Sequence, residues 1–147
     1  MKYILMTTLM LTFFGCQRSS DPELVLREYI ESRFDGSLGQ SRLLGMTTGD
    51  LRDELELMSE DEIKHYLAMD AYQLRRMRID RKTCSEQECF ITYTIRFDQY
   101  RLDNLDDKVF EAEVRKIAKI NLDSGAWKIS DVSDVKTFYR ANEAIEP

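Results

Sequence analysis

Histidine and the motifs of common catalytic sites are nearly missing from this chain. His65 is the only histidine, and the sequence around it supplies neither the orienting partner nor the cleft that a histidine base needs. There is no nucleophile elbow, phosphate-binding loop or Cys–His pair. Cys84 and Cys89 stand too far from His65 in the sequence to suggest a zinc site with four ligands. We therefore name no catalytic residue and expect no metal and no cofactor.

Positively charged residues are also fewer than negatively charged ones. The chain has 21 Lys and Arg residues against 27 Asp and Glu, so its formal net charge is −6. An acidic domain is a poor ligand for nucleic acid, and we expect no nucleic-acid partner. Only two prolines, Pro22 and Pro147, occur, and no internal repeat or low-complexity block interrupts the sequence. With 33% charged residues, the chain is typical of a globular protein with many solvated faces.

Residues 3–15 are different, because they contain no charge at all. Lys2 precedes this apolar run, the small residue Gly15 ends it, and Cys16 follows at once. This is the three-part layout of a secretory signal, and the run is shorter than the ~20 residues of a membrane-spanning helix. We expect residues 1–15 to be a signal peptide. If Cys16 has no role, the run is a plain secretory signal or an uncleaved anchor.

A cysteine directly after the small residue resembles the signal of bacterial lipoproteins. The resemblance implies cleavage before Cys16, acyl chains such as palmitate on its thiol, and acylation of the new amine. Two or three acyl chains hold a protein on a membrane durably, whereas one binds only marginally. Residues 16–20 would then be a short lipidated tether, and Gln17 carries no obvious signal for retention in the inner membrane. We expect a protein of the bacterial cell envelope, anchored to the outer membrane and facing the periplasm.

Removal of residues 1–15 leaves 132 of the 147 residues, which suits one domain over 21–147. The net charge of this part is −7, because Lys2 is the only charge removed. An exported chain with one further pair of cysteines favours a disulfide between Cys84 and Cys89. Free buried thiols are the alternative.

Helices are predicted in the first half of this domain. Asp21 can cap a helix over 22–35, Pro22 suits its first position, and Gly36 ends it. Helical spacing also places Leu51, Leu55 and Met58 on one face. A capping box at 59–62 begins another helix, which we expect to end near Asp70 or Ala71. The buried stripe of the first helix is Val25, Leu26, Tyr29, Ile30 and Phe34.

From residue 72 the period of the pattern becomes two, which predicts about four long, half-buried strands at hairpin spacing and therefore an antiparallel sheet. A symmetric loop that pairs Cys84 with Cys89 would put Ile79 opposite Thr94 and leave the apolar rows on opposite faces. One extra residue in either strand restores a common face. We therefore predict a bulge or an irregular loop near 81–88.

Helices followed by an antiparallel sheet form a segregated α+β architecture. The stretch DPELVLREYIESRFDG, the strands from Tyr72 onward and the closing WKISDV resemble small lipoproteins of the NTF2-like, or cystatin-like, superfamily. The resemblance implies N-terminal helices packed on a curved antiparallel sheet of about four strands, with a cone-shaped pocket between them. It supports a fold and not an activity, because the superfamily contains isomerases, dehydratases, carriers and non-enzymatic interaction domains.

Three residues are candidates for such a pocket: Tyr93, Lys116 and Asp131. Lys116 interrupts an otherwise apolar row, so strict alternation directs it inward, where it could bind an anion. The alternative is a bulge that turns Ile117 inward and lets Lys116 reach solvent. Tyr93 lies on an apolar row and Asp131 follows Trp127 and Ile129. Each also has an ordinary structural explanation, as a core tyrosine and a strand-end aspartate.

The stretch LRRMRIDRK is strongly basic, whereas residues 50–70 are acidic. The basic stripe could meet anionic lipid or an acidic partner, or pair across strands with Asp98, Glu111 and Glu113. Our leading hypothesis is a membrane-anchored lipoprotein whose NTF2-like domain is not catalytic and binds an envelope protein or a small ligand. The alternative is a small-molecule-binding or enzymatic cone of the isomerase or dehydratase type. A dimer formed sheet to sheet is a third, although its face is highly charged.

Overall fold

The computed structural model describes residues 21–36, 39–67, 72–101 and 108–141. These residues form helices α1 (Pro22–Phe34), α2 (Gln40–Met46), α3 (Gly49–Leu57) and α4 (Glu60–Leu67), followed by strands β1 (Tyr72–Cys84), β2 (Glu88–Tyr100), β3 (Lys108–Asp123) and β4 (Ala126–Ala141). The predicted signal peptide, Cys16, the tether and the predicted helix end near Asp70 or Ala71 lie outside the described residues. The side chain of His65 does too.

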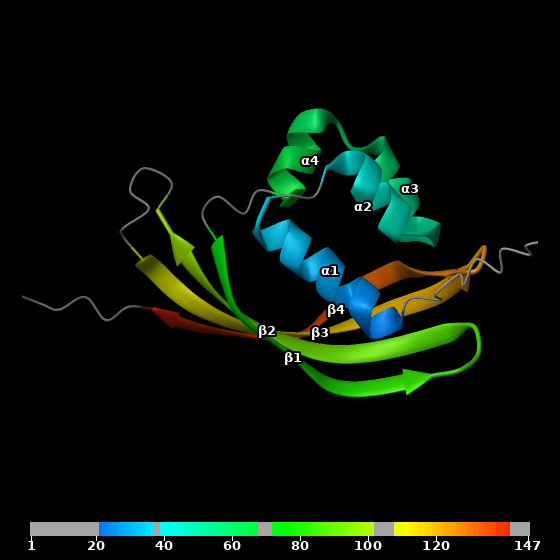
Figure 1. Cartoon of the computed structure of the whole chain (residues 1–147). Coiled ribbons are helices and arrows are strands. Elements are labelled where there is room, and N and C mark those ends of the chain that lie inside the picture. Colours follow the sequence, from blue (N-terminus) through cyan, green and yellow to red (C-terminus); the bar gives the residue numbers. More distant parts are fainter. Residues whose placement is uncertain (1–20, 37–38, 68–71, 102–107, 142–147) are drawn as a thin grey trace, which may run out of the picture.

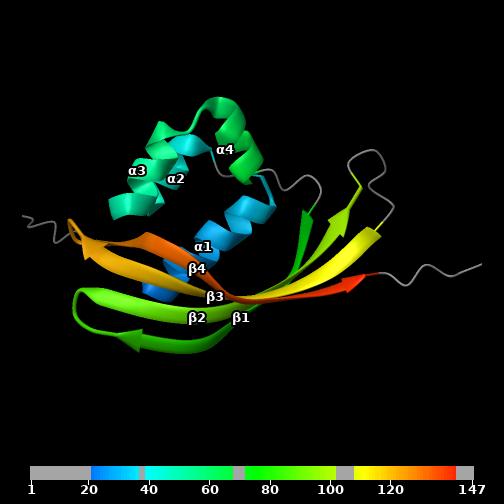
Figure 2. The ribbon, with the colours of Figure 1, turned by 180° about the vertical axis from the view of Figure 1, so that it is seen from behind.

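The strands form one antiparallel sheet in the order β1-β2-β3-β4. All the described helices lie on one side of it, with α1 across the sheet and α2 to α4 grouped together beyond α1 (Figures 1 and 2). The predicted α+β architecture is therefore confirmed. We call the side that the helices cover the inner face and the other side the outer face. No helix in the described ranges combines the length and apolar character of a membrane span.

Helix α1 forms where the sequence predicts it. The Asp21 side chain accepts a hydrogen bond from the Glu23 amide at 2.9 Å, and Pro22 occupies the first turn. Four of the five residues of the predicted stripe are buried, and Phe34 packs partly buried against the core. The stripe meets the inner face of the sheet, where the core contains Ile91, Tyr93 and Ile95 of β2 and Ala112, Val114, Ala118 and Ile120 of β3.

The capping box at the start of α4 is also present. The Ser59 amide donates to Glu62 Oε2 at 2.7 Å, and the Glu62 amide donates to Ser59 Oγ at 3.3 Å. Helix α2 was not predicted. It has seven residues, no side-chain cap and one buried side chain, Leu43, so it leaves almost no periodic signal in the sequence.

The first hairpin resolves the predicted register conflict. Its loop is symmetric, with Cys84 opposite Cys89, and the register shift lies between Ile79 and Arg81. Asp80 is therefore the extra residue, one position before the predicted segment 81–88. The shift puts Ile79 opposite Tyr93, so the apolar rows of β1 and β2 share the inner face.

Further register shifts also lie mainly in the edge strands. Arg75 is a second extra residue in β1, and Ser130 and Val135 are extra residues in β4. The two central strands pair without interruption from Glu88–Asn121 to Gln99–Phe110. Bulges and basic side chains on edge strands discourage pairing with another sheet, and this sheet uses both.

Deletion of Asp80 should test how much the fold depends on this register. Without it, residues 72–79 would exchange faces, so that Met77 and Ile79 point outward and Arg76 and Arg78 point into the core. We therefore expect the domain not to fold. The matched control is Asp80→Ala, which keeps the residue count and loses only polar contacts, for a cost of about 1–2 kcal/mol. Urea unfolding followed by circular dichroism measures both. Equal stability of the two variants would contradict the assigned register.

Candidate functional site

Tyr93 and Lys116 lie directly opposite each other on the inner face, at the centre of strands β2 and β3. Tyr93 is fully buried, whereas the Lys116 side chain is 22% exposed and forms an ion pair with Asp134 of β4. The two residues that the sequence analysis singled out on these strands are therefore neighbours. Asp134, an exposed residue of the edge strand, connects them to solvent.

The bulges of β4 explain where the sequence-based expectations fail. Strand β3 keeps its register with β2, so Lys116 stays on the inner face and the alternative of a turned-in Ile117 is wrong. The extra residue Ser130 places Asp131 on the outer face, opposite Lys119, where it accepts a hydrogen bond from Ser133. Asp131 is thus not part of the inner cluster, and Asp134 takes the place predicted for it.

Helices α1 and α4 bring further polar groups to this cluster, which no sequence pattern indicated. The hydroxyl groups of Tyr29 and Tyr66 are 2.5 Å apart, and Arg33 lies over both rings, 4.4 Å from the Tyr66 centroid. A terminal nitrogen of Arg33 also donates to the Tyr66 carbonyl at 3.1 Å. Among the described residues, however, the buried Tyr93 hydroxyl and Arg33 Nε have no hydrogen-bond partner.

The electrostatics of this inner cluster disfavour proton transfer. Burial raises the pKa of Tyr29 well above its usual value, and burial likewise raises the pKa of Tyr93. Both phenols are therefore neutral at physiological pH, and Lys116 is neutralised by Asp134. The two phenols can donate hydrogen bonds to a bound group, but they do not act as bases near neutrality. The described residues also contain no group of three His, Cys, Asp or Glu side chains placed to bind a metal.

The outer face carries a second candidate site. It consists of two adjoining hollows, each of about 300 Å³, which share Glu113 and Phe138. One is lined by residues of all four strands and the other by residues of β3 and β4. Phe138 is 49% exposed although it is a large aromatic residue. A smaller hollow adjoins them beside Arg76 and Arg96. The charged residues that line the three hollows are Arg76, Arg78, Asp80, Arg96, Glu111, Glu113, Arg115 and Arg140.

Some of these charges pair with each other. Arg78 lies 2.8 Å from Asp80, and Arg115 lies 3.6 Å from the other oxygen of the same carboxylate. Glu113 binds Arg96 of β2 at 2.8 Å, and not an arginine of β1 as the cross-strand alternative expected. Glu111 likewise pairs with Arg96, at 3.4 Å, and with Lys108 of β3, at 3.5 Å. The expected pair with Asp98 does exist, through Arg75.

Asp98 is buried on the outer face, with 1% of its surface exposed. Burial alone would raise its pKa, but hydrogen bonds from Lys108 at 2.7 Å and Arg75 at 2.5 Å outweigh burial and hold the pKa below its usual value. This carboxylate joins β1, β2 and β3 at the end of the sheet away from the first hairpin, and its role is structural.

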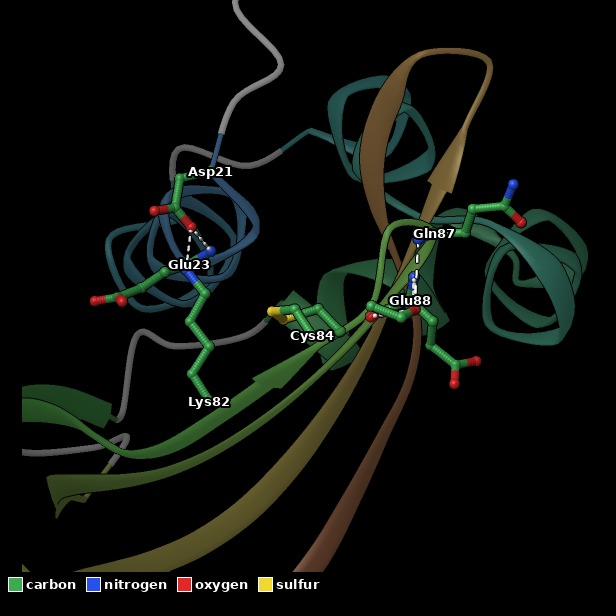
Figure 3. The surroundings of a disulfide bond; sticks show 8 residues. Asp21, Glu23, Lys82, Cys84, Gln87 and Glu88 are labelled. Atoms are coloured by element: carbon green, nitrogen blue, oxygen red, sulfur yellow. Dashed lines mark hydrogen bonds and ion pairs between the residues drawn. A yellow bond between two sulfur atoms is a disulfide. The ribbon is translucent and has the colours of Figure 1, made fainter.

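At the opposite end, the structure contains the disulfide between Cys84 and Cys89 that the sequence predicted. Figure 3 shows it beside the beginning of α1, where Lys82 binds the Asp21 carboxylate at 2.6 Å. This hydrogen bond lowers the pKa of Asp21. The first described residue, Asp21, is thus held at the tip of the β1–β2 hairpin.

Comparison with known proteins shows the fold alone. No protein-family model and no curated protein matches the chain. A SEC-C motif containing protein from Rhodopseudomonas palustris is similar in structure, with 13% identity, a TM-score of 0.59 and coverage of 78% of this chain and 79% of that one. The intermembrane space region of the chloroplast protein ARC6 has 12% identity, a TM-score of 0.55 and coverage of 77% and 92%.

Replacement of Tyr93 by Phe tests whether its hydroxyl has a partner. If it has none, we expect the variant to be as stable as the parent or more stable by about 1 kcal/mol, because an unsatisfied buried hydroxyl is removed. Tyr29→Phe is the control, since it breaks the bond to Tyr66 and should cost about 1 kcal/mol. Urea unfolding measures both. A large loss in Tyr93→Phe would mean that a bound water or ligand satisfies the hydroxyl.

The lowered pKa of Asp98 predicts a specific pH dependence. A carboxylate whose pKa is lower in the folded state adds stability above its unfolded pKa of about 3.9, and this stability is lost as the pH falls through the folded value. At pH 7 we expect Asp98→Asn to lower the free energy of unfolding by about 1–3 kcal/mol, because it removes a buried carboxylate paired with two cations. The loss is no larger because Lys108 and Arg75 are partly exposed to solvent. The difference from the parent should shrink below pH 4. A difference that stays constant from pH 7 to pH 2 would contradict the ion pairs.

Proposed function

We propose that this protein is a lipid-anchored protein of the bacterial envelope whose single NTF2-like domain binds a partner and catalyses no reaction. The observation that carries the binding role is the concentration of arginines around hollows on the outer face of a chain with net charge −6. An arginine surface of this kind in an acidic protein favours a recognition role over general solubility.

The NTF2-like assignment has two supports. One is the resemblance of the first helix and the strand series to small lipoproteins of that superfamily. The other is the architecture, in which α1 packs its apolar stripe on one face of an antiparallel sheet of four described strands. Because folds of this kind serve many functions, the fold contributes the framework and the outer face contributes the specificity.

The proposed anchor fits the position of the first described residue. Cys16 lies five positions before Asp21, and an extended tether of this length spans at most about 17 Å. Two or three acyl chains on Cys16 would therefore keep the hairpin end of the domain close to the bilayer. The proposed location is the periplasmic face of the outer membrane.

A small-molecule-binding or enzymatic inner cluster is the second candidate function. The observation in its favour is that the Tyr93 hydroxyl and Arg33 Nε are buried without a partner among the described residues, close to Lys116. A bound ligand with acceptor groups would satisfy both. Native mass spectrometry of the gently purified mature protein tests this. An extra mass that is released on denaturation would favour this second function, and a bare protein would favour the outer face.

Replacement of Cys16 by Ser tests the anchor. We expect the parent to incorporate a clickable palmitate analogue and to sediment with the membranes, and the variant to lose the label completely. Cys84→Ala with Cys89→Ala is the matched control, because it removes the other two cysteines and should leave the label in place. Persistent labelling of Cys16→Ser would contradict lipidation at this residue.

A further inference from the structure

The outer face of the sheet carries a continuous band of arginines across three strands. Arg76 of β1 lies directly opposite Arg96 of β2, and Thr94 of β2 lies between Arg78 of β1 and Arg115 of β3. All four side chains line the hollows of this face. We call Arg76, Arg78, Arg96 and Arg115 the arginine band.

The arginine band is not neutralised by its own surroundings. Like charges directly opposite each other on two strands are unfavourable, as Arg76 and Arg96 are here. Arg96 is paired with Glu113 and also with Glu111, at 3.4 Å. Arg78 and Arg115 share the single carboxylate of Asp80. Arg76 has no ion-pair partner anywhere in the described part of the chain. An incoming anion would therefore find free guanidinium donors and a local excess of positive charge.

We infer that the arginine band binds an acidic, extended segment of a partner polypeptide, an inference that rests on the proposed binding role of the outer face. The planar guanidinium group donates two parallel hydrogen bonds to a carboxylate, which suits Asp and Glu side chains. The hollows cross all four strands, which lie ~4.8 Å apart, so an extended segment of roughly four residues at ~3.3 Å each would reach from the arginine band to Phe138 of β4. The half-exposed Phe138 at the end of these hollows supplies an apolar contact.

The position of the band favours a polypeptide over membrane lipid. Arg78 lies six residues before Cys84 in β1. It is therefore about 20 Å along the strand from the hairpin tip, where Lys82 holds Asp21. Asp21, the first described residue, also lies on the inner side of the sheet as the cap of α1, whereas the band lies on the outer face. The potential of a membrane surface decays within about 8 Å at physiological ionic strength. Attachment at the hairpin end therefore does not by itself bring the band to lipid head groups, and the competition with soluble lipid described below separates the two ligands.

Binding of a labelled peptide to the full chain in detergent tests the inference. The probe is a fluorescein-labelled peptide of five Glu-Ser repeats, and the measurement is fluorescence anisotropy at several salt concentrations. We expect saturable binding that weakens with salt and no binding of the corresponding Lys-Ser peptide. Arg76→Glu with Arg115→Glu should weaken binding about tenfold or more, because charge-assisted hydrogen bonds are lost and repulsion is added.

The matched control reverses two charges on the helical side. Arg52→Glu with Lys64→Glu changes the net charge by the same amount, but these residues belong to α3 and α4. We expect it to leave the affinity of the peptide unchanged. Thermal unfolding of both variants verifies that they fold. A further variant with Lys at all four positions of the arginine band keeps the charge, and its binding should also weaken, because lysine lacks the planar fork.

Several results would overturn the inference. The first is that the Glu-Ser peptide does not bind. The second is that Arg52→Glu with Lys64→Glu weakens binding as much as Arg76→Glu with Arg115→Glu does. The third is that dihexanoylphosphatidylglycerol competes as strongly as unlabelled peptide. Self-association of the chain that Arg76→Glu with Arg115→Glu abolishes would assign the band to the acidic helices of a second copy. Palmitate labelling of Cys16 is independent of all these outcomes, so failure of peptide binding alone leaves the proposed anchor intact.

Discussion

The structure depends on keeping every apolar row of the sheet on the face that the helices cover. Asp80 achieves this in β1, because the extra residue returns Ile79 to the side of Tyr93 after a symmetric hairpin loop. In β4, at the opposite edge of the sheet, the extra residue Ser130 likewise keeps Val132 on the inner face, opposite Ala118. Since the central strands remain regular, α1 can lay its buried stripe on a continuous apolar surface.

This constraint also determines the electrostatics of the molecule. Once the apolar rows face the helices, the alternate residues of β1, β2 and β3 must face outward, and many of these are arginines. The acidic residues of α3 and α4 lie on the other side of the sheet, above α1 (Figure 1). The polarity that the sequence suggested between residues 50–70 and LRRMRIDRK therefore becomes a polarity between two faces of one domain.

Much of this fold was predictable from local patterns, and the errors have a common cause. Caps and helical spacing located α1 and α4, and the period of two located the strands and their faces. The bulge in β1 could be predicted because the cysteine pair fixed the register of the hairpin, but the bulges in β4 have no such reference. The exchange of Asp131 for Asp134 on the inner face could therefore not be foreseen. The contact between Tyr29 and Tyr66 joins positions 37 residues apart, which no periodicity reveals.

The two candidate sites differ in what they can do at neutral pH. On the inner face the tyrosines stay protonated, so their hydroxyl groups can donate hydrogen bonds but do not act as bases, and Lys116 is paired with Asp134. On the outer face the cations are accessible and only partly paired. Accessible guanidinium groups that are only partly paired retain donors for an incoming carboxylate, and this difference is why the proposed binding role is assigned to the outer face and not to the inner cluster.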